Sequence, residues 1–204
     1  DREWYQAHKS EYQRDYVEPM TALLEHVRAH VASAYRGMTL KEPKLFRLHR
    51  DVRFSMDKSP FKTSLGATLA LKGGGAGMEP PAAFYLQIGT ETFAGAGMYA
   101  LTGDPLERFR TAVLDARKGP AIARITADLE AKGYTLEAME TLKSAPRGVD
   151  KEHPRIALLK RKGLVAGCPG MPMEKLPTPA FADCCVERAL EMAPMVRWLA
   201  QHVA

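Results

Sequence analysis

The residues best suited to chemistry lie in the segment 44–63, which reads KLFRLHRDVRFSMDKSPFKT. Six lysines and arginines against two aspartates give this segment a net charge of +4, while the whole chain carries +5. Arginine binds phosphates and carboxylates through paired hydrogen bonds, so this concentration of cations predicts an anion site. The candidate ligand-binding residues of the segment are Arg47, Arg50, Arg53, Ser55, Lys58 and Lys62.

A second basic segment, 143–162, has seven cations against two carboxylates and a net charge of +5, which leaves −4 for the remaining chain. Two such segments in an otherwise acidic chain form one anion site if they meet in space. Lys160, Arg161 and Lys162 fall in the last turn of a predicted helix, where cations complement the helix dipole. Arg147 lies outside that helix and is the candidate ligand-binding residue of this segment.

Two glycines and two tyrosines in the middle of the chain complete the candidate site. Gly95 and Gly97 alternate within a predicted strand, which indicates that another backbone or a ligand comes close to one face of it. Both interpretations stay open at this point. Tyr85 and Tyr99 would stack on a bound ligand.

The elements that position these residues follow from apolar periodicity and from turn residues. Helical spacing and end signals predict helices over 3–16, 19–36, 104–118, 120–132, 153–162 and 180–202. Alternation predicts strands over 45–55, 65–71, 82–88 and 92–98. The pattern indicates a single α+β domain over residues 1–204, with a largely antiparallel sheet packed by N-terminal, middle and C-terminal helices.

The strand predicted over 45–55 carries a cation on its apolar side. The core-facing residues of this strand are predicted to be Phe46, Leu48, Val52 and Phe54. Arg50 falls among them, and a buried guanidinium needs a paired carboxylate. The alternative to an anion site is therefore an arginine–aspartate network that joins two strands to the turn between them.

The composition is that of a globular protein, with 46% hydrophobic and 26% charged residues. No apolar run approaches the roughly 18 residues of a membrane span, so we expect a soluble cytoplasmic protein. Because the chain opens on Asp1 rather than methionine, we expect processing, truncation or a leader before it. Cys168, Cys184 and Cys185 lack metal-ligand spacing and are interpreted as free thiols. We expect no metal and no cofactor, and nothing in the sequence sets an oligomeric state.

The residues 50–63 (RDVRFSMDKSPFKT) resemble the signature of a mostly bacterial family, the domain of unknown function 2461. Three further segments match the family: 2–5 (REWY), 95–99 (GAGMY) and 146–154 (PRGVDKEHP). The resemblance implies one domain that contains these segments, and it implies no activity, substrate or cofactor. The chain departs from the usual pattern at Met56, Phe61 and Ser64, where Lys, Tyr and His are common, so no mechanism that needs those side chains is predicted.

Three hypotheses of function follow. The first is a binding module for a small ligand that bears phosphate or carboxylate, and it ranks highest. The second is an enzyme acting on a phosphorylated or nucleotide-like substrate, with His153 as general acid or base and Asp51 or Asp57 orienting it. The third is a nucleic-acid-binding domain, ranked lower because exposed aromatic residues are sparse along the basic segments.

Overall fold

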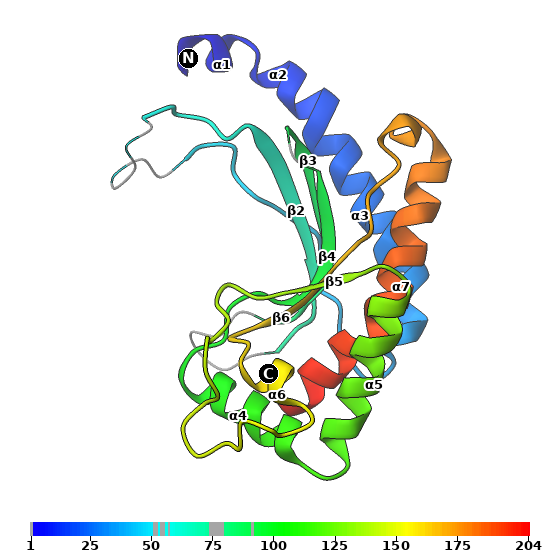
Figure 1. The fold of residues 1–204 in the computed structure, drawn as a ribbon. Coiled ribbons are helices and arrows are strands. Elements are labelled where there is room, and N and C mark those ends of the chain that lie inside the picture. Colours follow the sequence, from blue (N-terminus) through cyan, green and yellow to red (C-terminus); the bar gives the residue numbers. More distant parts are fainter. Residues whose placement is uncertain (1, 51–52, 54–55, 57, 74–79, 91) are drawn as a thin grey trace.

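The computed structural model describes residues 2–50, 53, 56, 58–73, 80–90 and 92–204 (Figure 1). This part of the chain forms a six-stranded sheet in the order β1-β2-β3-β4-β6-β5, and every neighbouring pair is antiparallel. The strands are β1 (Lys44–Leu45), β2 (Ser64–Ala70), β3 (Ala82–Gly89), β4 (Phe93–Met98), β5 (Thr135–Glu137) and β6 (Leu164–Gly167). The α+β class with a largely antiparallel sheet is confirmed.

The described helices come from the start, middle and end of the chain, as predicted. They are α1 (Arg2–Ala7), α2 (Lys9–Tyr12), α3 (Glu18–Val31), α4 (Gly103–Leu114), α5 (Lys118–Ala131), α6 (Ile156–Leu159) and α7 (Pro179–His202). A π-helical turn (Gln13–Val17) joins α2 to α3, and 3-10 turns span Ala32–Tyr35 and Met173–Lys175. Within the described residues, no helix combines the length and the apolar character that crossing a membrane requires.

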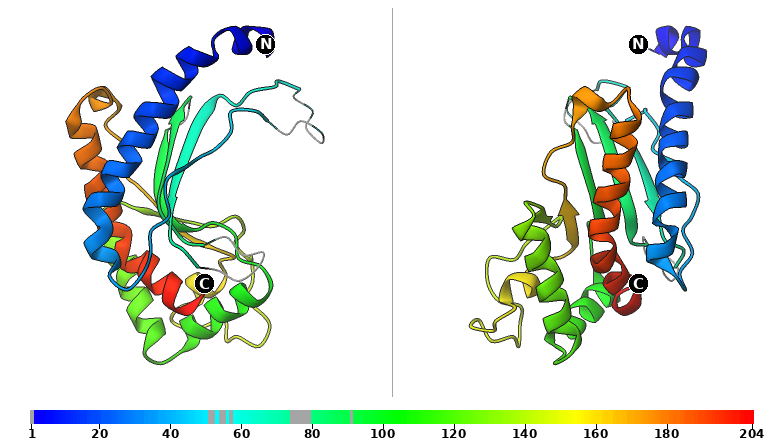
Figure 2. Two further views of the ribbon diagram at one scale, coloured as in Figure 1. Left: turned by 180° about the vertical axis from the view of Figure 1, so that it is seen from behind. Right: turned by 90° about the vertical axis from the view of Figure 1, so that its right-hand side faces the viewer.

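One hydrophobic core lies between the helices and one face of the sheet. Helices α3 and α7 run along this face, as both views in Figure 2 show. Alternate residues of the strands supply the sheet side of the core, and Leu69, Phe84 and Leu86 are fully buried there. The opposite face of the sheet is concave and carries no helix along its upper part (Figure 1).

The predicted strand over 45–55 is wrong in its length and in the side on which it places Phe46. Strand β1 ends at Leu45, which pairs with the buried Ala67 and packs against the core. Phe46 therefore lies on the other side of the sheet, because successive strand residues alternate between faces. The predicted core position of Phe46 is therefore wrong, Leu48 and Arg50 are half-buried, and Val52 and Phe54 lie outside the described residues.

Beyond β1 the chain leaves the sheet as a projecting arm, by which we mean the described residues between 46 and 63. Its two sides are joined at the bridge His49–Phe61 and by hydrogen bonds from Arg50 N to Pro60 O (2.9 Å) and from Lys62 N to Leu48 O (2.9 Å). The Tyr5 ring of α1 lies 5.3 Å from both His49 and Phe61 and supports the base of the arm.

Candidate functional site

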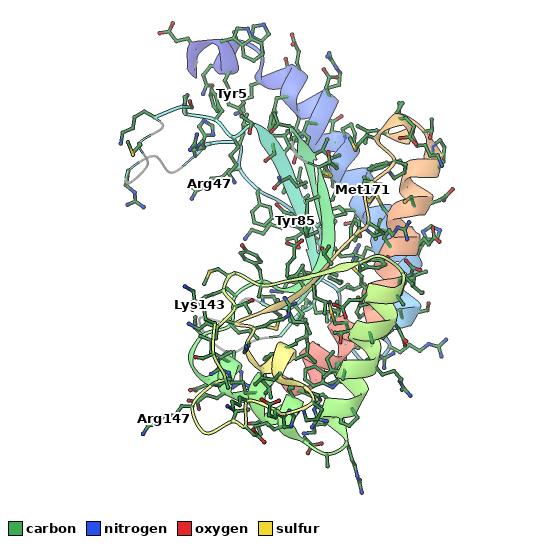
Figure 3. All side chains as sticks on the ribbon, in the orientation of Figure 1. Tyr5, Arg47, Tyr85, Lys143, Arg147 and Met171 are labelled. Atoms are coloured by element: carbon green, nitrogen blue, oxygen red, sulfur yellow. The ribbon has the colours of Figure 1, made fainter. Side chains whose placement is uncertain are left out.

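The register of the sheet determines which side chains share its uncovered face. Lys44, Thr68 and Tyr85 lie opposite one another on β1, β2 and β3, so they point to the same side. The neighbours of Tyr85 on its own strand are buried in the core, so Tyr85 points away from the helices. Figure 3 shows it on the concave side. We call this side the open face and define it by Lys44, Phe46, Thr68, Tyr85, Gln87 and Phe93.

Three aromatic rings form a row across the open face. The Phe46 and Tyr85 ring centroids are 6.0 Å apart, and those of Tyr85 and Phe93 are 6.1 Å apart. Phe46 is 36% exposed, although its side chain is large and apolar. Burial raises the pKa of the Tyr85 hydroxyl, which stays protonated at neutral pH and donates to Gln87 Oε1 at 3.0 Å. The row thus offers apolar ring surface beside a polar pair.

Two lysines lie over the outermost ring of this row. Lys44 Nζ is 5.8 Å and Lys62 Nζ is 5.9 Å from the Phe46 ring centroid, and both residues are exposed. Among the described residues, no carboxylate lies within ion-pair distance of either ammonium group. Each ammonium group is held near the ring by a cation–π interaction, and neither positive charge is neutralised by a described carboxylate.

The two candidate glycines are in close contact with protein atoms. A Cβ at Gly95 would lie 2.7 Å from the Ala166 carbonyl oxygen and 3.0 Å from the Phe93 ring. A Cβ at Gly97 would lie 2.1 Å from the Leu164 carbonyl oxygen. Of the two interpretations of this glycine pair, the geometry favours packing of neighbouring groups over approach of a ligand.

Most cations of the second basic segment are engaged in structural contacts. Arg155 Nε donates to Val113 O at 2.7 Å, and Arg161 donates to Leu136 O at 2.7 Å. Lys160 donates to Lys143 O at 3.2 Å, and Lys162 pairs with Glu140 at 2.8 Å. These contacts tie loops and helix ends together, so this segment supplies far fewer cations to a ligand site than its net charge indicates.

The cations of the second segment that stay exposed do not all meet those of the arm. Figure 3 shows Arg47 and Lys143 on the concave side, one above and one below Tyr85. Arg147 lies farther along, at the lower end of the molecule, and its side chain points outward (Figure 3). Tyr99, just after β4, is 58% exposed. Arg47 and Arg147 therefore lie toward different ends of the molecule (Figure 3).

Of the catalytic candidates of the enzyme hypothesis, only His153 lies within the described residues. His153 Nδ1 accepts the backbone N–H of Arg155 at 3.1 Å, in the turn that leads into α6. Helix α6 and the arm lie at opposite ends of the molecule (Figure 1). Asp51, Asp57 and Ser55 lie outside the described residues. No group of three or more potential metal-ligating side chains occurs among the residues that the structure describes.

Comparison with protein families shows which family the chain belongs to. A family model described as "Conserved hypothetical protein (DUF2461)" matches residues 1–198. The chain belongs to this family. DUF2461 membership thus extends over all the elements described above except the end of α7, and it brings no activity with it. No curated protein and no solved structure matches the chain.

Sequence reasoning missed the residues that give the DUF2461 open face its character. The alternation places Phe46 on the core side, no pattern singles out Phe93, and Lys44 enters only through the net charge of its segment. Phe93 lies far from Lys44 and Phe46 in the sequence, so no local pattern joins the three. The pairing of β1 with β2 and of β3 with β4 would have been needed to find them.

Proposed function

We propose that the open face binds a ligand that bears phosphate or carboxylate groups, with Lys44 and Lys62 as its primary anchors. Arg47, which is exposed on the concave side, contributes further positive charge. Tyr85 and Phe46 form the apolar floor beside the anion. The observation that supports this proposal is the position of two ammonium groups over one exposed ring without a carboxylate partner among the described residues.

The proposal predicts that removing the two ammonium groups abolishes most anion binding. Titration calorimetry with inorganic tripolyphosphate at low salt would compare the wild-type protein with the double variant Lys44→Gln, Lys62→Gln. We expect at least about tenfold weaker binding, because a hydrogen bond to a charged group contributes roughly 1.5–3 kcal/mol. Both side chains are exposed, so the folded state should persist in the variant.

The matched control removes the same charge from the helix-covered side of the molecule. Lys118 at the start of α5 and Lys175 near α7 are both exposed. The double variant Lys118→Gln, Lys175→Gln should bind tripolyphosphate within about twofold of the wild-type protein, because the site charge is unchanged. Equal weakening in both double variants would show a dependence on net charge alone and would contradict the proposed site.

A further inference from the structure

We propose, building on the anion site of the preceding section, that the phosphate-bearing ligand is single-stranded nucleic acid whose bases stack along Phe46, Tyr85 and Phe93. A row of rings on a sheet face, bordered by cations, is a known way for proteins to hold unpaired bases. Nucleic acid ranked low from the sequence because aromatic residues are sparse along the basic segments. The fold supplies them instead from Phe46, just after β1, and from β3 and β4.

The spacing of the rings suits a succession of bases. Neighbouring centroids in the row are 6.0 and 6.1 Å apart, and the rings come from neighbouring parts of one sheet. Stacking on aromatic side chains tolerates any base, since every base has a π face. Such faces are accessible in a single strand but not within a duplex, where the bases stack on one another.

Glycines beneath the rings hold the row close to the sheet. Phe93 ring atoms lie 2.9–3.0 Å from where a Cβ would sit at Gly95 and at Gly167. The Tyr85 hydroxyl oxygen is 3.0 Å from the corresponding position at Gly66. Because side chains at these three positions would displace the rings, glycine allows the rings to lie close to the sheet backbone, with neighbouring rings tilted by 60° and 50° to each other.

The positions of the cations favour a chain of nucleotides over a mononucleotide. Figure 3 shows Arg47 on one side of Tyr85 and Lys143 on the other, both toward the concave side. The phosphates of one nucleotide would engage only the end at Lys44 and Lys62. A single strand has one phosphate per base, so it contacts both ends while its bases cover the rings. The chain is basic, with a pI of about 9.1, so its net charge is opposite to that of nucleic acid.

The test is fluorescence anisotropy with a labelled single-stranded thymidine dodecamer, with the same dodecamer in a duplex and with thymidine monophosphate as competitor. We expect the single strand to bind most tightly and to lose about tenfold or more in affinity between 50 and 200 mM salt, because about three phosphates are neutralised. Tyr85→Leu and Phe46→Leu should each weaken its binding at least about fivefold, whereas Tyr85→Phe, which keeps the ring, should bind within about twofold of wild type.

Tripolyphosphate binding separates this inference from the proposed function. The wild-type protein should bind both ligands, and the control Leu190→Ala, on the exposed side of α7, should change neither affinity. Tripolyphosphate binding without binding of the single strand would overturn the nucleic-acid inference and leave the anion site standing. Equal affinity for single strand and duplex, or unchanged binding in both leucine variants of the row, would also overturn it. Loss of both ligands would overturn both proposals.

Discussion

Gly97→Ala is expected to destabilise the protein by about 2–4 kcal/mol, which is a large loss for one methyl group. Gly97 has φ +130°, a conformation that residues with a side chain rarely adopt. The added Cβ would also meet the Leu164 carbonyl oxygen at 2.1 Å, so β4 and β6 would have to separate. Urea unfolding should show a lower midpoint at an unchanged slope, and the melting temperature should fall by about 4–12 °C.

Gly148→Ala is the matched control, because it separates backbone strain from crowding. Gly148 also has a positive φ, +78°, but a Cβ there meets no atom within 4 Å. Its replacement should cost only about 1–2 kcal/mol, the ordinary penalty of a left-handed conformation. Equal losses in the two variants would show that the close approach of β4 to β6 contributes nothing to the requirement for glycine.

Removal of the Glu191 carboxylate is expected to cause the second largest loss of folding stability. Glu191 on α7 accepts a hydrogen bond from the Tyr134 hydroxyl and pairs with Lys132 at 3.0 Å and with Arg188 at 3.1 Å. Its side chain is 20% exposed. Glu191→Ala removes the acceptor of the exposed Lys132 and of two partly buried donors, Tyr134 and Arg188, which should cost about 2–4 kcal/mol at pH 7.

The stability lost in Glu191→Ala should become smaller as the pH falls. Burial opposes ionisation of Glu191, but the hydrogen bonds from Tyr134, Lys132 and Arg188 outweigh it and hold the pKa below its ordinary value. A carboxylate with a lowered folded-state pKa stabilises the protein above its unfolded-state pKa, near 4.5, and the stabilisation disappears as the pH falls through the folded-state pKa. The stability difference between wild type and Glu191→Ala should therefore narrow from pH 6 to pH 3.5.

The control for this residue lies one turn earlier on the same helix. Glu187 is exposed, and no ion pair of it is found among the described residues. Glu187→Ala should change the free energy of unfolding by no more than about 0.5 kcal/mol. A difference between wild type and Glu191→Ala that stays constant from pH 6 to pH 3.5 would contradict the ionised state assigned to Glu191.

The sequence predicted the fold class and most elements because those depend on local periodicity. Apolar spacing located α3, α5 and α7, and alternation located β2, β3 and β4. The same reasoning failed at 45–55, because alternation does not say which of its two faces meets the core. That choice depends on the pairing of Leu45 with Ala67, which is a contact between distant positions.

The candidate site was only partly predictable for a similar reason. Net charge identified two basic segments, but charge alone does not tell a ligand-binding cation from a structural one. Arg155 and Arg161 each donate to carbonyl groups more than twenty residues away in the sequence, and no local pattern predicts such contacts. Lys62 and Lys44 share a ring only because the two sides of the arm pair with each other, as the Lys62 N to Leu48 O hydrogen bond shows. Tertiary contacts therefore decide which part of the positive charge is free for a ligand.

The most direct test of the account is a map of backbone amide shifts during a tripolyphosphate titration, recorded by two-dimensional NMR on the nitrogen-15-labelled protein. The account predicts that the largest shifts occur at residues 44–46, at Lys62 and around Tyr85, and that they saturate together. It predicts small shifts at Arg155 and Arg161, whose guanidinium groups are bound to carbonyls. Largest shifts within 143–162, or shifts scattered over the surface without saturation, would contradict an anion site on the open face.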